Sequence, residues 1–388
     1  MGVCVLNRYP ALVAVALPPL VYGMFRFTIG ILVPKIESQY LINDSIMGLI
    51  VSVSVGVVGI GVFASSYAAE RFGERKTVLL GLVLFSFPLL GMSIDLGLAT
   101  FTMLFMLSSL GSGLFIPAVY GLVSLILPKR RGVGAGIVSS SYNLGGLVGP
   151  AIIGYLLLYY YWGLSLLLIS LAGVVSLVIF VGAFSGSSDE ATQGARGQLR
   201  QVLRNRNVVV LALASLLADC GFVTYVSWTP SFLFRTFGVS GGLMAVVDLL
   251  FGIGVGLGGI GVFVAGFLLD RTGGKRSAVL GGSVSCLATL GLYLSGSLSL
   301  LAALLLMLVA SFFLNWFWTL VTVMSQLRVS QSQRSAATSL VQSAGFVGAC
   351  AGPGLAGLLG GATAVPLILT VVAPYVAYVA VIAFLYKN

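Results

Sequence analysis

One stretch of sequence decides the fold because it occurs twice: Ser66-Tyr-Ala-Ala-Glu70-Arg71-Phe-Gly73-Glu-Arg75-Lys76 and Gly266-Phe-Leu-Leu-Asp270-Arg271-Thr-Gly273-Gly-Lys275-Arg276. Each copy places an acid, an arginine, a glycine and basic residues between two long apolar runs. The acids of the two copies are 200 positions apart. A repeat of this kind in an apolar chain predicts a membrane protein built from two related halves.

Composition assigns the chain to the integral membrane proteins. Of its 388 residues, 59% are hydrophobic and 8% are charged, against about 25% charged residues in soluble domains. Continuous apolar runs of about 18 residues or more predict transmembrane helices rather than the alternating segments of a β-barrel. We therefore expect an all-α membrane protein with twelve spans, at 11–33, 45–69, 77–94, 97–127, 132–158, 162–184, 208–233, 239–269, 277–297, 299–327, 335–361 and 364–386.

The basic residues are strongly biased to one side of these spans. If the N-terminus is inside, 17 of the 20 lysines and arginines fall in inner loops or termini, while the outer loops hold only Lys35 and Arg235. The positive-inside rule therefore predicts a multi-pass protein of the cell membrane with both termini in the cytoplasm. This orientation and the anionic lipids of the inner leaflet account for the net charge of +10, so no nucleic-acid partner is expected.

The repeat extends into the apolar runs. Span 5 contains Gly145 and the pair Gly149-Pro150, and span 11 contains Gly348 and the pair Gly352-Pro353, displaced by 203 positions. We expect both pairs to act as hinge or packing points. Parallel repeats of this kind predict two six-helix bundles, at 1–184 and 208–388, joined by a cytoplasmic linker at 185–207.

The linker has a composition of its own. Arg196, Arg200 and Arg204 follow one another at helical spacing, with Leu199 and Val202 among the apolar residues between them. The pattern fits a short amphipathic helix on the inner membrane surface, and equally a solvated basic segment.

These features together resemble the major facilitator superfamily, and the resemblance covers the whole chain. The loop at 266–276 is close to the superfamily's signature between spans 8 and 9, and 66–76 to its copy between spans 2 and 3, with Ser66 and Glu70 where Gly and Asp are usual. The resemblance implies a major facilitator fold of two pseudo-symmetric six-helix bundles.

Two motifs within the spans point to different branches of that superfamily. The span-5 glycine-proline pattern resembles the antiporter motif, with Ile153 replacing one glycine, but span 4 lacks the basic residue of many drug antiporters. The start of span 1, Tyr22-Gly-Met-Phe-Arg26-Phe-Thr-Ile-Gly30, is similar to members that move organic anions.

The repeated loops are candidates for gating. An acid at an inner helix end can accept hydrogen bonds from free backbone N–H groups of a neighbouring helix, and its arginine can pair with an acid of the other bundle. Such contacts form in one orientation of the bundles and break in the other. The alternative is that the charges only satisfy the positive-inside rule. We predict gating roles for Glu70, Arg71, Gly73, Arg75, Asp270, Arg271, Gly273 and Lys275.

Three charged residues lie inside the predicted spans, namely Arg26, Asp219 and Asp248. Each costs about 2.5–3.5 kcal/mol at the membrane centre, so a wet cavity or a partner is expected. The planar guanidinium of Arg26 suits a carboxylate or phosphate. Asp219 is its expected partner in the empty protein, and Asp219 and Asp248 are the candidate proton carriers. The alternatives are a permanent structural ion pair, and for Asp248 simple hydrogen bonding near the outer mouth.

Neutral polar residues form stripes at helical spacing. Span 10 carries Asn315, Thr319, Thr322 and Gln326 on one expected helix face, next to Trp316 and Trp318. Hydrogen bonding between helices is the common fate of such residues, and the tryptophans could equally serve packing or interfacial anchoring. With these alternatives open, the predicted substrate-binding set is Arg26, Tyr22, Asn143, Asn315, Thr319 and Gln342.

No motif for an enzyme is present. The chain has no histidine, its four cysteines lack metal or redox spacing, and it has no P-loop, so we expect no metal, no cofactor and no catalytic residues. The leading hypothesis is a monomeric secondary transporter of a small organic anion, by proton symport or anion exchange. The alternatives are a proton-coupled drug or metabolite efflux antiporter, and a non-transporting receptor or lipid-handling protein.

The topology can be tested by labelling. In a cysteine-free background, single cysteines at Ser187 and Ser297 should react with impermeant thiol reagents from the inside and the outside respectively, because the charge bias places 185–207 in the cytoplasm. Reaction of both positions from the same face would contradict the twelve-span arrangement.

Overall fold

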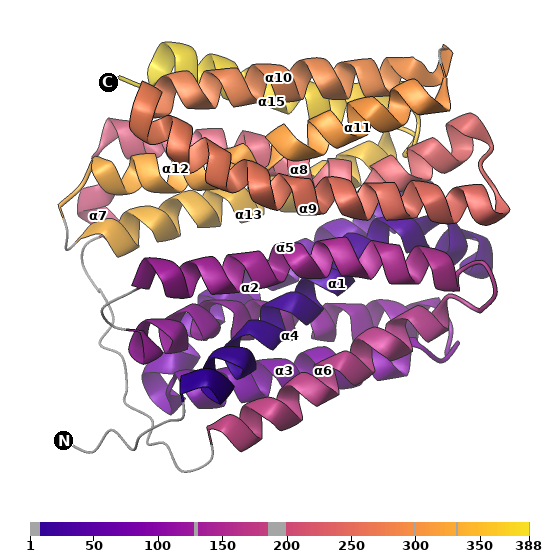
Figure 1. Ribbon diagram of the computed structural model, residues 1–388, viewed down its shortest axis with the longest axis horizontal. Helices are drawn as coiled ribbons and strands as arrows, with labels where there is room; N and C mark the ends of the chain where they lie inside the picture. Colours follow the sequence, from indigo (N-terminus) through magenta and orange to yellow (C-terminus); the bar gives the residue numbers. More distant parts are fainter. Residues whose placement is uncertain (1–7, 128–130, 185–198, 298, 331–332, 388) are drawn as a thin grey trace. The chain divides into compact units, whose positions relative to one another are not determined.

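The computed structural model describes residues 8–127, 131–184, 199–297, 299–330 and 333–387, and nearly all of them are helical (Figure 1). The first half comprises α1 (Arg8–Tyr40), α2 (Asp44–Phe72), α3 (Glu74–Met92), α4 (Leu98–Ile126), α5 (Arg131–Leu156) and α6 (Gly163–Ala183). The second comprises the single turn α7 (Leu199–Val202), then α8 (Arg206–Phe237), α9 (Gly241–Thr272), α10 (Gly274–Leu294), α11 (Leu300–Leu314), α12 (Trp316–Leu327), α13 (Arg334–Leu358), α14 (Ala364–Leu367) and α15 (Ala373–Ala380).

Ten helical segments of the described residues are long and apolar enough to cross a membrane. Together with α5 and α13 they correspond to the twelve spans expected from the sequence, and the described part of the chain contains no strand. The prediction of an all-α membrane fold is therefore confirmed.

Some helix boundaries differ from the predicted ones. α1 continues to Tyr40 instead of ending at 33, and the helix expected over 299–327 is divided at Asn315 into α11 and α12. The asparagine amide competes with the backbone for hydrogen bonds, which weakens a helix at that point. Turns of π-helix at Ile368–Val372 and Val381–Leu385 interrupt the last span.

The linker is described only from residue 199 onward. Its four-residue turn α7 carries the buried side chain of Val202, whereas the neighbouring Leu203 is 50% exposed. The rest of the predicted amphipathic helix, including Arg196, lies outside the described residues.

The chain divides into two compact units. Unit 1 contains residues 1–28 and 57–194, and unit 2 contains residues 29–56 and 195–388. The last third of α1 and nearly the first half of α2 therefore pack with the C-terminal helices. The bundle boundaries at 1–184 and 208–388 stay a prediction from the sequence repeat.

The repeated loops have the same backbone geometry in both units. Gly73 precedes α3 with φ 86° and ψ 157°, and Gly273 precedes α10 with φ 87° and ψ 149°. This conformation is essentially restricted to glycine. The hydroxyls of Thr77 and Ser277 donate to the carbonyls of these glycines at 2.9 and 3.1 Å. The sequence repeat is thus a structural repeat.

Glycines bring paired helices into backbone contact in each unit. In unit 1 a Cβ on Gly145 or Gly149 of α5 would collide with the backbone of α1 at Leu20 or Met24. In unit 2 the equivalent pair is α13 on α8, where a Cβ on Gly348 or Gly352 would collide with the carbonyl of Leu216 or Cys220. Small residues at these points allow the close approach on which helix association in lipid depends.

The prolines that follow two of these glycines lie inside helices. Pro150 is buried within α5, and the carbonyl of Pro353 within α13 accepts a hydrogen bond from the Trp228 indole at 3.2 Å. Proline leaves a carbonyl of the preceding turn without its helical donor, which makes such positions suited to bending.

Replacement of Gly273 by alanine should destabilise the protein. An L side chain at this φ and ψ costs about 1–3 kcal/mol, so thermal unfolding in detergent should begin at a lower temperature than in the wild type. Gly242→Ala is the matched control, because it lies in the first turn of α9 and a Cβ added there would have nothing within 4 Å. Equal unfolding temperatures for the two variants would contradict the assigned backbone strain.

Candidate functional site

Arg26 lies in the middle of α1, half-buried, beside an aromatic group of unit 1. Tyr22, one turn earlier, is buried and close enough to Arg26 for an electrostatic interaction. Its ring stacks on Tyr142 of α5 with centroids 5.6 Å apart and meets Phe85 and Phe115 edge-on. The structure therefore brings two predicted substrate residues, Arg26 and Tyr22, together with α5.

Asn143 follows Tyr142 on α5 and is half-buried. Its amide Nδ2 donates to the carbonyl of Ser139 at 2.9 Å, and the Ser139 hydroxyl is 3.0 Å from the Tyr120 hydroxyl of α4. The Asn143 amide is thus oriented by a carbonyl of its own helix. The hydroxyls of Ser139 and Tyr120 lie one turn away from it. Polar groups of α4 and α5 lie next to the aromatic group around Tyr22.

Asp219 is held in the contact between α8 and α13 of unit 2. It is 2% exposed, accepts a hydrogen bond from the Ser215 hydroxyl at 3.2 Å, and lies where a Cβ on Gly345 would be. The missing side chain of Gly345 makes the space that the carboxylate fills. Arg26 belongs to the other unit, so their pairing stays a prediction.

Asp248 is buried in α9 at 2% exposure. Its Oδ2 has no hydrogen-bond partner among the described residues, and Lys35 of α1 acts on it electrostatically. A buried carboxylate with an unsatisfied oxygen is costly, which makes this residue a suitable place for a proton.

The neutral residues of unit 2 have two different settings. Asn315 is 7% exposed and its amide nitrogen fills the space next to Gly258 of α9, so the structure gives it a packing contact. Thr319 on α12 and Gln342 on α13 are half-buried. Asn315 lies between α11 and α12 with helical φ and ψ, so the shared face of Asn315 and Gln326 stays a prediction.

Gln326 of that stripe and the neighbouring Trp316 serve helix contacts. The Gln326 amide donates to the Thr338 hydroxyl at 3.0 Å and thereby joins α12 to α13. Trp316 is buried against Gly261 and Gly281, which favours packing over interfacial anchoring.

The predicted gating residues lie at the ends of α2, α3, α9 and α10. Arg71 donates to the Tyr67 hydroxyl at 3.3 Å, and the Arg271 guanidinium lies 4.2 Å from the Phe267 ring centroid, so both arginines rest on an aromatic residue one turn earlier. The Lys275 ammonium donates to the Tyr386 carbonyl at 3.0 Å. Asp270 is exposed, and Glu70 and Arg75 are half-buried.

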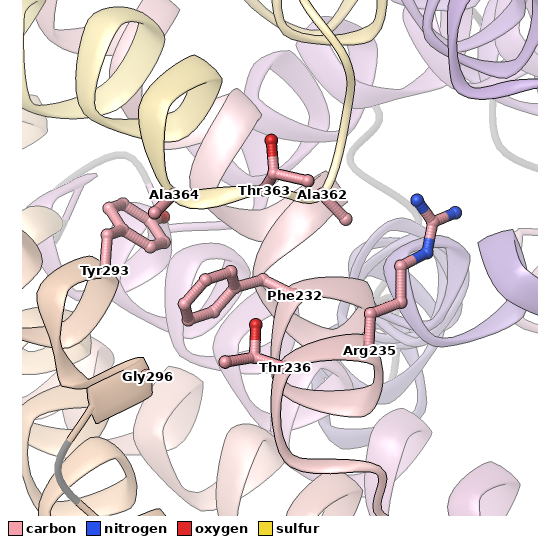
Figure 2. A pocket seen from close by; sticks show the side chains of 8 residues that line it. All are labelled: Phe232, Arg235, Thr236, Tyr293, Gly296, Ala362, Thr363 and Ala364. Atoms are coloured by element: carbon pink, nitrogen blue, oxygen red, sulfur yellow. The ribbon is translucent and has the colours of Figure 1, made fainter.

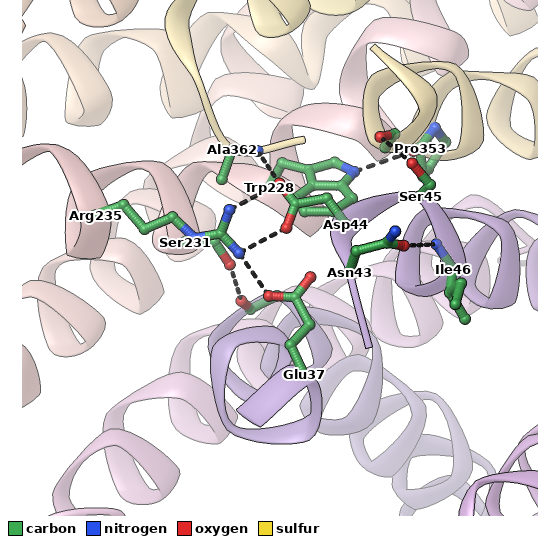
Figure 3. Close-up of polar contacts among 12 residues, drawn as sticks. Glu37, Asn43, Asp44, Ser45, Ile46, Trp228, Ser231, Arg235, Pro353 and Ala362 are labelled. Carbon is green, nitrogen blue, oxygen red and sulfur yellow. Dashed lines mark hydrogen bonds and ion pairs between the residues drawn. The ribbon is translucent and has the colours of Figure 1, made fainter. Parts of the chain in front are cut away.

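One charged cluster could not be found from the sequence (Figure 3). Arg235 of α8 contacts Asp44 of α2 at 2.7 Å and Glu37 of α1 at 2.5 Å, all within unit 2. These residues were expected in outer loops, but the helices extend far enough to include them. The available signal was that Arg235 is one of only two basic residues expected outside, with two acids in the opposite loop.

A cavity of about 230 Å³ lies beside this cluster (Figure 2). It is lined by Phe232, Arg235, Thr236, Tyr293, Gly296, Ala362, Thr363 and Ala364. Figure 2 shows the Arg235 guanidinium turned away from Phe232 and Tyr293. None of the predicted substrate residues lines this cavity.

Comparison with known proteins gives the family. The model of the Major Facilitator Superfamily matches residues 19–353. The chain belongs to the major facilitator superfamily. This is a superfamily of transporters and not of enzymes, which agrees with the function class expected from the sequence.

Individual members of the superfamily are only distantly similar. The Hexuronate transporter of Bacillus subtilis (strain 168) is 23% identical over 277 residues, covering 68% of this chain and 65% of that protein. The Sialic acid transporter NanX of Escherichia coli (strain K12) is 25% identical over 155 residues, covering 37% of each chain. The match thus spans less than two-thirds of the length of these curated relatives.

A solved structure extends the likeness of fold to the whole chain. The inward-facing, unoccupied bacterial homologue of the human lysosomal transporter Spinster superposes with a TM-score of 0.77 at 14% sequence identity, covering 99% of this chain and 96% of that one. At this identity the superposition shows a shared major facilitator fold.

The contact between Asp219 and Gly345 predicts a coupling between two substitutions. Gly345→Ala should lower stability by about 1–3 kcal/mol, because the methyl group overlaps the carboxylate. In an Asp219→Ala background the same change should cost much less, as a double-mutant cycle of thermal unfolding would measure. Gly136→Ala of α5, with nothing within 4 Å, is the control. Additive costs for Gly345→Ala and Asp219→Ala would show that the two groups do not meet.

Proposed function

We propose that this superfamily member is a secondary transporter that moves a small organic acid across the cell membrane by alternating access, with both termini in the cytoplasm. The observation that carries the proposal is Arg26, a half-buried guanidinium in the middle of a long apolar helix beside buried Tyr22. Two relatives that are named for carrying acidic sugars support it.

The chemistry around Arg26 fits a carboxylate on a hydroxylated or planar body. A guanidinium can hold both oxygens of a carboxylate, and such charge-assisted contacts are roughly twice as strong as neutral hydrogen bonds. Half-buried Tyr142, which stacks on Tyr22, offers aromatic surface for the body of the ligand, and Asn143 offers an amide. We include Thr319 and Gln342 of unit 2 in the same substrate site, together with Asn315 if its amide turns away from Gly258.

Coupling to protons is assigned to the two buried carboxylates, Asp219 and Asp248. A carboxylic acid is far cheaper to bury than a carboxylate, so each can carry a proton through the transport cycle. When an anion occupies Arg26, a carboxylate that was paired with the guanidinium loses its partner and gains a proton more readily. If Asp219 gains a proton in this way, the protein is a proton symporter. If neither aspartate titrates, it is an anion exchanger.

Gating is assigned to the repeated loops. Glu70, Arg71 and Arg75 with Gly73 form one copy, and the second copy has Asp270, Arg271, Gly273 and Lys275. The glycines hold both turns in one backbone conformation, so the two loops present their charges in the same way. An exposed Asp270 is free to change partners between the two states of the cycle.

Proton-coupled efflux of a drug or metabolite is the second candidate. The glycine-proline motif of α5 favours it, since Gly145 and Gly149 pack directly on α1. Efflux of a cation would not require Arg26, whereas uptake of an acid would, so this residue separates the two functions.

Substitution of Arg26 should weaken binding of an organic acid. Loss of a charge-assisted hydrogen-bond pair costs about 1.5–3 kcal/mol, so Arg26→Ala should bind glucuronate about tenfold to a hundredfold more weakly in titration calorimetry. Arg26→Lys should fall between it and the wild type, because the charge remains and the fork is lost. Arg276→Ala, exposed in the first turn of α10, is the control and should bind normally.

Calorimetry combined with uptake into proteoliposomes assigns the proton. Asp219→Asn should keep acid binding but abolish accumulation driven by a proton gradient. Full accumulation by this variant would move the proton site to Asp248 or establish exchange. Wild-type affinity in Arg26→Ala would refute the binding role of Arg26 and favour the efflux function.

A further inference from the structure

Three charged side chains join three helices at one end of unit 2 (Figure 3). Both terminal nitrogens of Arg235 bind Asp44, at 2.7 and 2.8 Å, and Nη2 also contacts Glu37 at 2.5 Å. The N–H of Ala362 donates to Asp44 at 3.3 Å. We call Glu37, Asp44 and Arg235 the outer latch, since they lie on the outer side in the proposed orientation.

Backbone contacts surround the latch. Between α2 and α13, Gly48 lies against Gly357, and the Ser52 hydroxyl accepts a hydrogen bond from the Gly354 N–H at 2.7 Å. Ser45 donates to the Gly357 carbonyl at 3.1 Å. The charged residues of the latch lie at the end of this contact between small residues.

The latch holds more negative than positive charge. Arg235 is shared by two carboxylates: Asp44 engages both terminal nitrogens, whereas Glu37 contacts Nη2 alone. The Glu37 side chain is 8% exposed, and its Oε1 is buried with no hydrogen-bond partner among the described residues. With all three groups ionised, the cluster carries a net charge of −1, and its least exposed member is Glu37; a proton on the buried Oε1 would remove that charge.

No other described charged group offsets this charge. Among the charged groups of α8 only Arg235 acts on Glu37, and among those of α2 only Asp44 does. The turn after α13 contributes the uncharged backbone N–H of Ala362, which donates to Asp44. Lys35, on α1 itself, interacts with Asp248 of α9 instead. The 33 residues of α1 measure about 50 Å against a hydrocarbon thickness of about 30 Å, so Glu37, near its end, lies beyond the hydrocarbon and within reach of protons from water.

We propose that Glu37 is a proton-binding residue of the outer latch, which takes up a proton from the outer solution as the latch closes. When the latch opens, all three groups are hydrated and Glu37 returns the proton to the same solution. This proton is therefore not transported. By linkage, an acidic outer solution favours the state that is closed on that side.

The inference rests on the proposed function only for the orientation and for the cycle that the latch controls. It adds to Asp219 and Asp248 a third carboxylate with a separate task. Those two would move protons with the substrate, whereas Glu37 would set how readily the outer side closes at a given pH.

Spin-label distances across the latch test the proposal without any substrate. Labels at Leu41→Cys and Leu243→Cys, both at exposed sites, are measured at pH 5 and pH 8 after replacement of the native cysteines. In the wild-type latch the short-distance population should grow at pH 5. Glu37→Gln, which mimics the protonated acid, should give the same large short-distance population at both pH values.

Two further variants make the result specific. Asp44→Asn leaves Glu37 as the only carboxylate on Arg235, so the pH response should move to lower pH. Asp95→Asn replaces an exposed carboxylate of the α3–α4 loop and should keep the wild-type response. If Glu37→Gln does not fold, the shift in Asp44→Asn carries the test.

A pH response in Glu37→Gln equal to that of the wild type, no response in the wild-type latch, or an unshifted response in Asp44→Asn would each overturn the proposal. Failure of organic-acid binding by the same protein would leave these distances unchanged, so the two proposals fail separately.

Discussion

The structure depends on backbone-to-backbone contact between paired helices at glycine. Lipid offers no hydrophobic force to bring helices together, so close van der Waals approach must supply it. Gly145 and Gly149 seat α5 on α1, and Gly348 and Gly352 seat α13 on α8. These contacts fix the helix that carries Arg26 and the one that carries Asp219. Arg26 and Asp219, the charges that we propose to be functional, are thus placed by residues that have no side chain.

Small residues also make room for charged side chains, which are costly to bury in a membrane. Asp219 is accommodated because Gly345 leaves room for its carboxylate, and Ser215 supplies a hydrogen bond. At the end of unit 2 where α2 and α13 also meet through small residues, Arg235 contacts two carboxylates. The charged contacts lie at the edge of this small-residue packing, which is where we propose that pH acts.

Much of the fold could be predicted from the sequence because its signals are local. Apolar length predicted the spans, and the repeated Gly73 and Gly273 carry the same backbone conformation. The outer latch could not be predicted, because Arg235 lies 191 positions from Asp44 and no local signal shows that α1 continues to Tyr40. Helical spacing likewise predicted which polar residues share a face, but not which neighbour fills the space beside Asn315.

The central claim is that the chain carries organic acids driven by an ion gradient. Uptake of labelled glucuronate into proteoliposomes with an acidic exterior tests it most directly. The account predicts accumulation above the external concentration that collapses when a protonophore is added, or, for exchange, uptake that requires an internal acid. The uptake assay is repeated with a panel of sugar acids, aromatic acids and dicarboxylic acids, placed outside or inside the liposomes. If none of them gives more uptake than protein-free liposomes, the claim is contradicted.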